Sequence, residues 1–143
     1  LLQIRGTKTV HMWDPADRFV LPEEELERFH AEFVHRNLPW RDVFQTTAFV
    51  LPLAPGQGLH FPVTVPHWVK NGPEVSVSFS ITFRTADSER RELLYKANAR
   101  LRKLGMNPTP PGRSILLDRT KQLAFGAAAS LKRVWAPHIG RRM

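Results

Sequence analysis

The stretch that most constrains the fold is residues 75–83, VSVSFSITF, in which apolar and hydroxyl side chains alternate without exception. A period of two indicates a β-strand with two unlike faces. The apolar face carries Val75, Val77, Phe79, Ile81 and Phe83, and the other face carries Ser76, Ser78, Ser80 and Thr82. A row of small hydroxyls suits neither a dry core nor a charged exterior. We therefore expect this face to line a wet cavity.

The residues before this strand predict further strands separated by turns. Residues 43–53 form a strand pattern, residues 59–63 are a short apolar run, and Asn71-Gly72-Pro73 is a strong turn signal. His67 follows Pro66, whose ring favours an extended backbone. This arrangement indicates several short strands close to the alternating one.

Residues 1–5 and 8–13 predict two more strands around the turn Arg5-Gly6-Thr7. Lys8 shares a face of the second strand with Val10 and Met12. If these two apolar residues face the interior, Lys8 does so too. A buried ammonium is costly, so Lys8 either pairs with an anion or reaches solvent from the end of the strand.

Three helices are predicted. The first covers residues 21–36 and begins with acidic residues that oppose the helix dipole. The second begins near residues 86–88 and ends at Gly105, and the third runs from Asp118 to Trp135. The second and third helices each carry an apolar stripe and basic residues over the remaining surface.

Charge divides the chain into two parts. Residues 1–83 hold seven Lys and Arg against nine Asp and Glu, and residues 84–143 hold fourteen against four, which gives charges of −2 and +10. A basic surface is compatible with nucleic-acid binding. Because no aromatic residues are interleaved with the basic ones, we expect instead that the helices dock through their stripes and keep their basic faces in water. Nucleic acid is therefore not an expected partner.

Composition sets further bounds. The chain has 143 residues, enough for a domain with a real core. It has no cysteine, which excludes disulfides and thiolate metal sites and is consistent with a cytoplasmic location. No apolar run approaches the roughly 20 residues needed to cross a bilayer, so no membrane association is expected.

Two motifs carry a resemblance to a known family. The segment from Pro55 to Phe83, with GQGLHFPVTVPH ending at His67 and the alternating strand after it, resembles the distal metal-binding half of a cupin-type double-stranded β-helix. Leu1–Pro15, LLQIRGTKTVHMWDP, resembles the QIxGxK hairpin of the JmjC/cupin-like branch, which contains asparaginyl hydroxylases. The resemblance implies a mainly β fold with α: an incomplete jelly roll over residues 1–84 with an inserted helix 21–36, and a basic C-terminal helical pair over residues 85–143.

The resemblance also implies site residues and cofactors. His67 matches the distal Fe(II) ligand, Lys8 matches the lysine that binds the distal carboxylate of 2-oxoglutarate, and Ser78 stands where relatives present a small polar side chain to the cofactor. The alternatives are a structural histidine hydrogen-bonded in the turn and a cavity-lining serine. His60 replaces an aromatic or apolar position and is not an expected ligand, and His30 and His35 lie on different faces of their helix.

The family's His-x-Asp iron motif precedes the QIxGxK hairpin, and neither His-x-Asp nor His-x-Glu occurs in this chain. We therefore expect the chain to be the C-terminal part of a longer Fe(II)/2-oxoglutarate-dependent oxygenase, a hydroxylase rather than a demethylase. Its substrate would be a protein side chain or a small molecule, and relatives imply a homodimer formed through the C-terminal helices. The alternative is a non-catalytic cupin-like module that binds a ligand or partner, including a transcriptional regulator.

Overall fold

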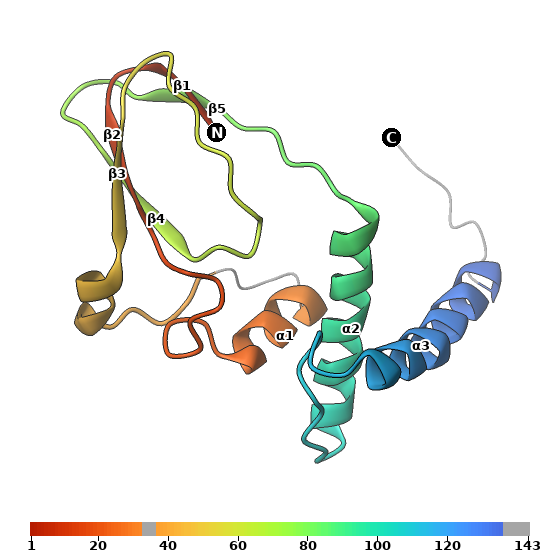
Figure 1. Cartoon of the computed structure of the whole chain (residues 1–143). Coiled ribbons are helices and arrows are strands. Elements are labelled where there is room, and N and C mark those ends of the chain that lie inside the picture. Colours follow the sequence, from red (N-terminus) through yellow and green to blue (C-terminus); the bar gives the residue numbers. More distant parts are fainter. Residues whose placement is uncertain (33–36, 136–143) are drawn as a thin grey trace. The chain divides into compact units, whose positions relative to one another are not determined.

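The computed structural model describes residues 1–32 and 37–135, with side chains as far as residue 127 (Figure 1). The chain is mixed α/β and divides into two compact units. Unit 1 comprises residues 1–26 and 37–83, and unit 2 comprises residues 27–32 and 84–135 of the described chain. Helix α1 therefore begins in unit 1 and ends in unit 2.

Unit 1 contains two small antiparallel sheets and no closed barrel among its described residues. One sheet pairs β1 with β5, and the other has the order β3-β2-β4. The strands are β1 (Leu2–Arg5), β2 (Lys8–Met12), β3 (Phe49–Leu53), β4 (His67–Asn71) and β5 (Val77–Phe79). The two strands predicted on either side of Gly6 are both present, but they belong to different sheets.

Two strand predictions were too long. Residues 42–47 form a 3-10 helix, η1 (Asp42–Thr47), and only residues 49–53 of the predicted strand 43–53 pair with β2. The turns of η1 bury Phe44. Of the alternating stretch 75–83, only β5 is a strand, because β1 offers a partner over that length alone.

Strand β2 is packed on both of its faces. On one face, Val10 is completely buried and Met12 nearly so, in a cluster with Val65. On the other face, His11 stacks on Trp68 with the ring centroids 3.9 Å apart. Just after the strand, Trp13 packs against Phe44, and its indole Nε1 donates a 2.7 Å hydrogen bond to the carbonyl of Phe44. The centre of unit 1 is therefore this strand, and its register determines where Lys8 lies.

The turn between β1 and β2 fits closely against residues 72–76. Gly6 has a φ of +68°, and a Cβ on it would lie 2.5 Å from the carbonyl oxygen of Val75. The amide of Gly72 donates a 2.8 Å hydrogen bond to the carbonyl of Thr7, and a Cβ on Gly72 would overlap the Thr7 hydroxyl. Both positions need glycine because two backbone segments meet there.

Unit 2 contains three helical elements. They are the end of α1 (Glu23–Glu32), α2 (Ala86–Lys103) and α3 (Ile115–Trp135). The last turn predicted for α1, residues 33–36, lies outside the described residues. No helix in the described part of the chain is long and apolar enough to cross a membrane.

The ends of α2 and α3 follow from local capping. Thr85 and Ser88 form a capping box at the start of α2, and Gly105, with a φ of +80°, follows its end as predicted. Helix α3 begins three residues before the predicted cap, Asp118. The Asp118 carboxylate instead accepts a 2.7 Å hydrogen bond from the amide of Gly112 and so closes the preceding loop.

The second half of α1 is held against α2 by two ion pairs, of which Glu32–Lys103 is the longer at 3.8 Å, and by one aromatic stack. The Glu27 side chain is only 3% exposed, and its two carboxylate oxygens accept hydrogen bonds of 2.7 and 3.0 Å from the guanidinium of Arg102. One turn later, the buried His30 ring stacks on Tyr95 with the centroids 5.1 Å apart. Burial lowers the pKa of His30, and the charges of Lys96 and Arg84 lower it further, whereas Glu92 opposes them.

The first prediction concerns the glycine turn. Gly6→Ala is expected to lower the free energy of unfolding by about 2–4 kcal/mol, because it adds a backbone clash to the cost of positive φ. Gly56→Ala is the matched control. Gly56 also has positive φ, at +86°, but a Cβ there meets nothing within 4 Å. This control should lose only about 1–2 kcal/mol. Equal losses in urea unfolding would show that the two segments do not meet closely at Gly6.

The second prediction concerns pH. Because the folded-state pKa of His30 lies below its ordinary 6.5, the unfolded chain takes up this proton first as pH falls. The contribution of the neutral, buried His30 to the free energy of unfolding is therefore complete above pH 6.5 and is lost progressively below it. A His30→Phe variant, which keeps the ring stack, should lose less stability than wild type between pH about 7.5 and about 5 in urea unfolding. Parallel losses in the two proteins would contradict the assignment.

Candidate functional site

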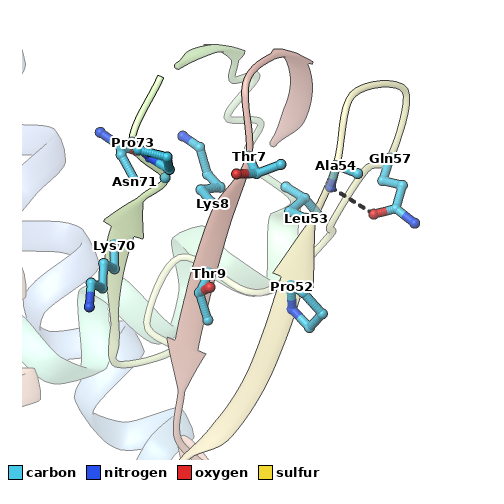
Figure 2. A pocket seen from close by; sticks show the side chains of 11 residues that line it. Thr7, Lys8, Thr9, Pro52, Leu53, Ala54, Gln57, Lys70, Asn71 and Pro73 are labelled. Atoms are coloured by element: carbon cyan, nitrogen blue, oxygen red, sulfur yellow. Dashed lines mark hydrogen bonds between the residues drawn. The ribbon is translucent and has the colours of Figure 1, made fainter. Parts of the chain in front are cut away.

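Lys8 lines a pocket of about 730 Å³ at one end of the β3-β2-β4 sheet (Figure 2). The Lys8 side chain is half-buried, and the described part of the chain places no carboxylate within ion-pair distance of it. Strand pairing sets Lys8 directly opposite Asn71 on β4 and Leu53 on β3. The pocket is lined by Thr7, Lys8, Thr9, Pro52, Leu53, Ala54, Gln57, Lys70, Asn71, Gly72 and Pro73.

The chemistry of this pocket suits a small anion. Lys8 supplies an ammonium, while Thr7 and Asn71 add a hydroxyl and an amide beside it. Lys70 lines the same opening, but its side chain extends away from Lys8 in Figure 2. A carboxylate bound beside Lys8 would therefore meet its ammonium together with neutral donors.

His67 begins β4, and its ring has a defined orientation. The ring Nδ1 lies 2.9 Å from the carbonyl oxygen of Val65, and the ring packs on Phe61 with the centroids 4.8 Å apart. A carbonyl only accepts hydrogen bonds, so in the neutral ring the proton must be on Nδ1. Nε2 then carries the free lone pair. His67 is exposed, so this nitrogen is not sealed inside the core.

Lys8 and His67 share one face of the sheet but do not share an opening. Lys8, Val10 and Met12 alternate along β2 to one face, and His67 lies directly opposite Met12. Four residues of strand place the ends of this row about 13 Å apart. Between them lies the fully buried Val10, and His67 does not line the lysine pocket.

Ser78 makes a structural contact. Its hydroxyl donates a 2.7 Å hydrogen bond to Oε1 of Gln3, which is completely buried on β1. Ser76 accepts a 3.0 Å hydrogen bond from Nε2 of the same amide. Two of the four hydroxyls of the alternating stretch therefore satisfy a buried side chain, and neither lines the pocket at Lys8.

The other face of the alternating stretch is solvent-exposed. Its apolar residues, together with Leu2 and Ile4 of the paired strand, are between 40% and 70% exposed. They are Val75, Val77, Phe79, Ile81 and Phe83. Alternation thus separated two unlike faces around β5, where Ser76 and Ser78 turn toward Gln3, but Ser80 and Thr82 beyond it are exposed like the apolar residues.

Sequence reasoning missed Gln3. It lies in an apolar run, LLQI. The sequence feature that could have indicated its role is a single polar residue within this run, at a strand position that faces inward. The motif QIxGxK contained this glutamine, but only its lysine was assigned a role. The remaining histidine near the site, His60, stacks on Phe83 with the ring centroids 5.8 Å apart.

The side chains that the structure describes include no group of three His, Asp, Glu or Cys that could together hold a metal ion. Comparison of the chain with protein-family models, with curated proteins and with solved structures finds no match. A function must therefore be inferred from the residues and their geometry.

The third prediction separates a structural from a cofactor role for Ser78. Ser78→Ala leaves the buried Oε1 of Gln3 without its donor and should cost about 1–3 kcal/mol of unfolding free energy. Ser80→Ala, two residues along at an exposed position, should change it by less than about 0.5 kcal/mol. Urea unfolding of both variants measures the difference, and a Ser78→Ala protein as stable as wild type would remove the structural role.

Proposed function

We propose that this chain is the C-terminal part of a JmjC/cupin-like protein that, when complete, is an Fe(II)- and 2-oxoglutarate-dependent hydroxylase. The observation that carries the proposal is the geometry of His67. Its Nδ1 is hydrogen-bonded to a backbone carbonyl, which leaves Nε2 free. The His67 side chain lies on the same face of the sheet as Lys8. Histidines that bind metals are usually oriented through their second nitrogen in this way.

The strand arrangement supports the proposal. The chain passes from the first sheet to the second between β1 and β2, and returns between β4 and β5. All the strand pairs are antiparallel. Two antiparallel sheets connected in this manner are compatible with half of a jelly roll.

The described residues do not complete an iron site. A non-haem iron centre of this class uses two histidines and one carboxylate, and His67 provides one of the three. The proposal therefore requires a His-x-Asp pair ahead of Leu1 in the complete protein. Strand β4 ends the sheet order β3-β2-β4, so a strand carrying that pair has an edge to join beside His67.

The residues at Lys8 do fit the cosubstrate. The ammonium of Lys8, with Thr7 and Asn71 beside it, would hold the distal carboxylate of 2-oxoglutarate. When bound, iron and the oxoacid supply the oxidising chemistry of this enzyme class, in which O2 gives one atom to the product hydroxyl and one to succinate, with release of CO2. The part of this chain is to bind and orient.

A second candidate is a non-catalytic cupin-like module that binds an anionic ligand in the Lys8 pocket. The fully buried Val10 between the pocket and His67 favours it, because the lysine pocket is then a site by itself. The two candidates differ in whether binding at Lys8 depends on a metal at His67.

The fourth prediction tests the proposal in the full-length protein. Succinate formation from 2-oxoglutarate with Fe(II) and O2 should be abolished by His67→Ala and retained by the control His60→Ala. Lys8→Met should raise KM for 2-oxoglutarate about 10- to 100-fold, since it removes a charge-assisted hydrogen bond. Unchanged turnover in His67→Ala would reject the oxygenase, and metal-independent binding of 2-oxoglutarate lost in Lys8→Met would favour the module.

A further inference from the structure

Gln3 places a fully satisfied amide inside unit 1. The side chain is 0% exposed, and its Nε2 lies 2.6 and 3.0 Å from the carbonyls of Arg5 and Gly6 and 3.0 Å from the hydroxyl of Ser76, so its two hydrogens are shared among three acceptors. Its Oε1 accepts from Ser78 at 2.7 Å. Burying an amide is costly unless it is hydrogen-bonded. Here the partners belong to the β1–β2 turn and to the alternating stretch around β5.

The atoms that Gln3 joins belong to the two segments behind the lysine pocket. Arg5 and Gly6 form the turn that leads directly into Thr7 and Lys8. Ser76 follows residues 71–73, which form the opposite wall of the pocket. The two segments touch where the Gly72 amide donates to the Thr7 carbonyl. Nε2 of Gln3 therefore contacts both the turn that precedes Thr7 and a residue three positions after Pro73.

We propose that Gln3 is a positioning residue for the Lys8 pocket, fixing the spacing between Thr7 on one wall and residues 71–73 on the other. This inference rests on the proposed role of Lys8 as the anion-binding residue. Lys8 is a long and flexible side chain on an open pocket, so a carboxylate is bound well only when the neutral donors beside it are held in place.

The chemistry of the amide accounts for the choice of residue. Two carbonyls of the turn and the Ser76 hydroxyl need a donor, and Ser78 needs an acceptor. Glutamate offers no N–H to the carbonyls, and methionine fills the same space without polar atoms. Gln3→Met thus removes the link while it keeps the packing volume.

The fifth prediction uses two measurements on the same protein samples: calorimetric affinity for 2-oxoglutarate, and hydrogen exchange at the Gly72 amide. Gln3→Met should weaken the affinity of the folded protein about tenfold and accelerate exchange at Gly72. Gln45→Met, which removes the side-chain amide beside His11 and does not line the pocket, should change neither. A role in stability alone would not alter the affinity of molecules that remain folded.

Ser76→Ala provides a second variant that removes only the link to the far segment, in case Gln3→Met does not fold. It should weaken affinity by a smaller factor, about threefold, and also accelerate exchange at Gly72. Wild-type affinity and exchange in either folded variant would overturn the positioning role. If wild type itself binds no 2-oxoglutarate, the proposed function fails. In that case, unchanged hydrogen exchange at the Gly72 amide in the variants would separately reject the positioning role of Gln3.

Discussion

The structure of unit 1 depends on the hydrogen bonds of one buried amide. Gln3 satisfies two carbonyls of the β1–β2 turn and two serines of the alternating stretch, so the turn, β5 and the residues after Gly72 are arranged around it. Because the Gln3 side chain is fully buried, its oxygen and nitrogen need these partners in the folded state. Two parts of the lysine pocket lie close in sequence to these groups: Thr7 directly follows Gly6, and Pro73 lies three residues before Ser76.

This arrangement changes the meaning of the serine pattern. Alternation in residues 75–83 predicted that hydroxyls would face a wet cavity, and Ser78 was expected at the cofactor. In the structure, Ser78 lies opposite the buried Gln3 on β1, and both Ser76 and Ser78 turn toward its amide. Periodicity shows that two faces differ, whereas the direction of each face depends on what the neighbouring strand carries.

Local signals were sufficient where local chemistry decides the structure. Helix α2 begins within the predicted start at residues 86–88, and Gly105 follows its end as predicted, since capping involves residues close in sequence. Contacts between distant segments were not readable in the same way. Residues 42–47 form η1, in which Phe44 packs against Trp13, and nothing in the pattern of residues 43–53 indicates that contact. For the candidate site, the resemblance predicted roles for Lys8 and His67 individually, whereas the fully buried Val10 between them is seen only in the packing.

The proposed function depends on the orientation of the His67 imidazole ring. If the Val65 carbonyl holds the proton of His67 on Nδ1, the free Nε2 is available to a metal. Long-range proton–nitrogen NMR of histidine-labelled protein reports this directly, at a pH where histidine is neutral, with His67→Ala to assign the signal. The account predicts the Nδ1–H form for His67. A ring protonated on Nε2 would contradict it.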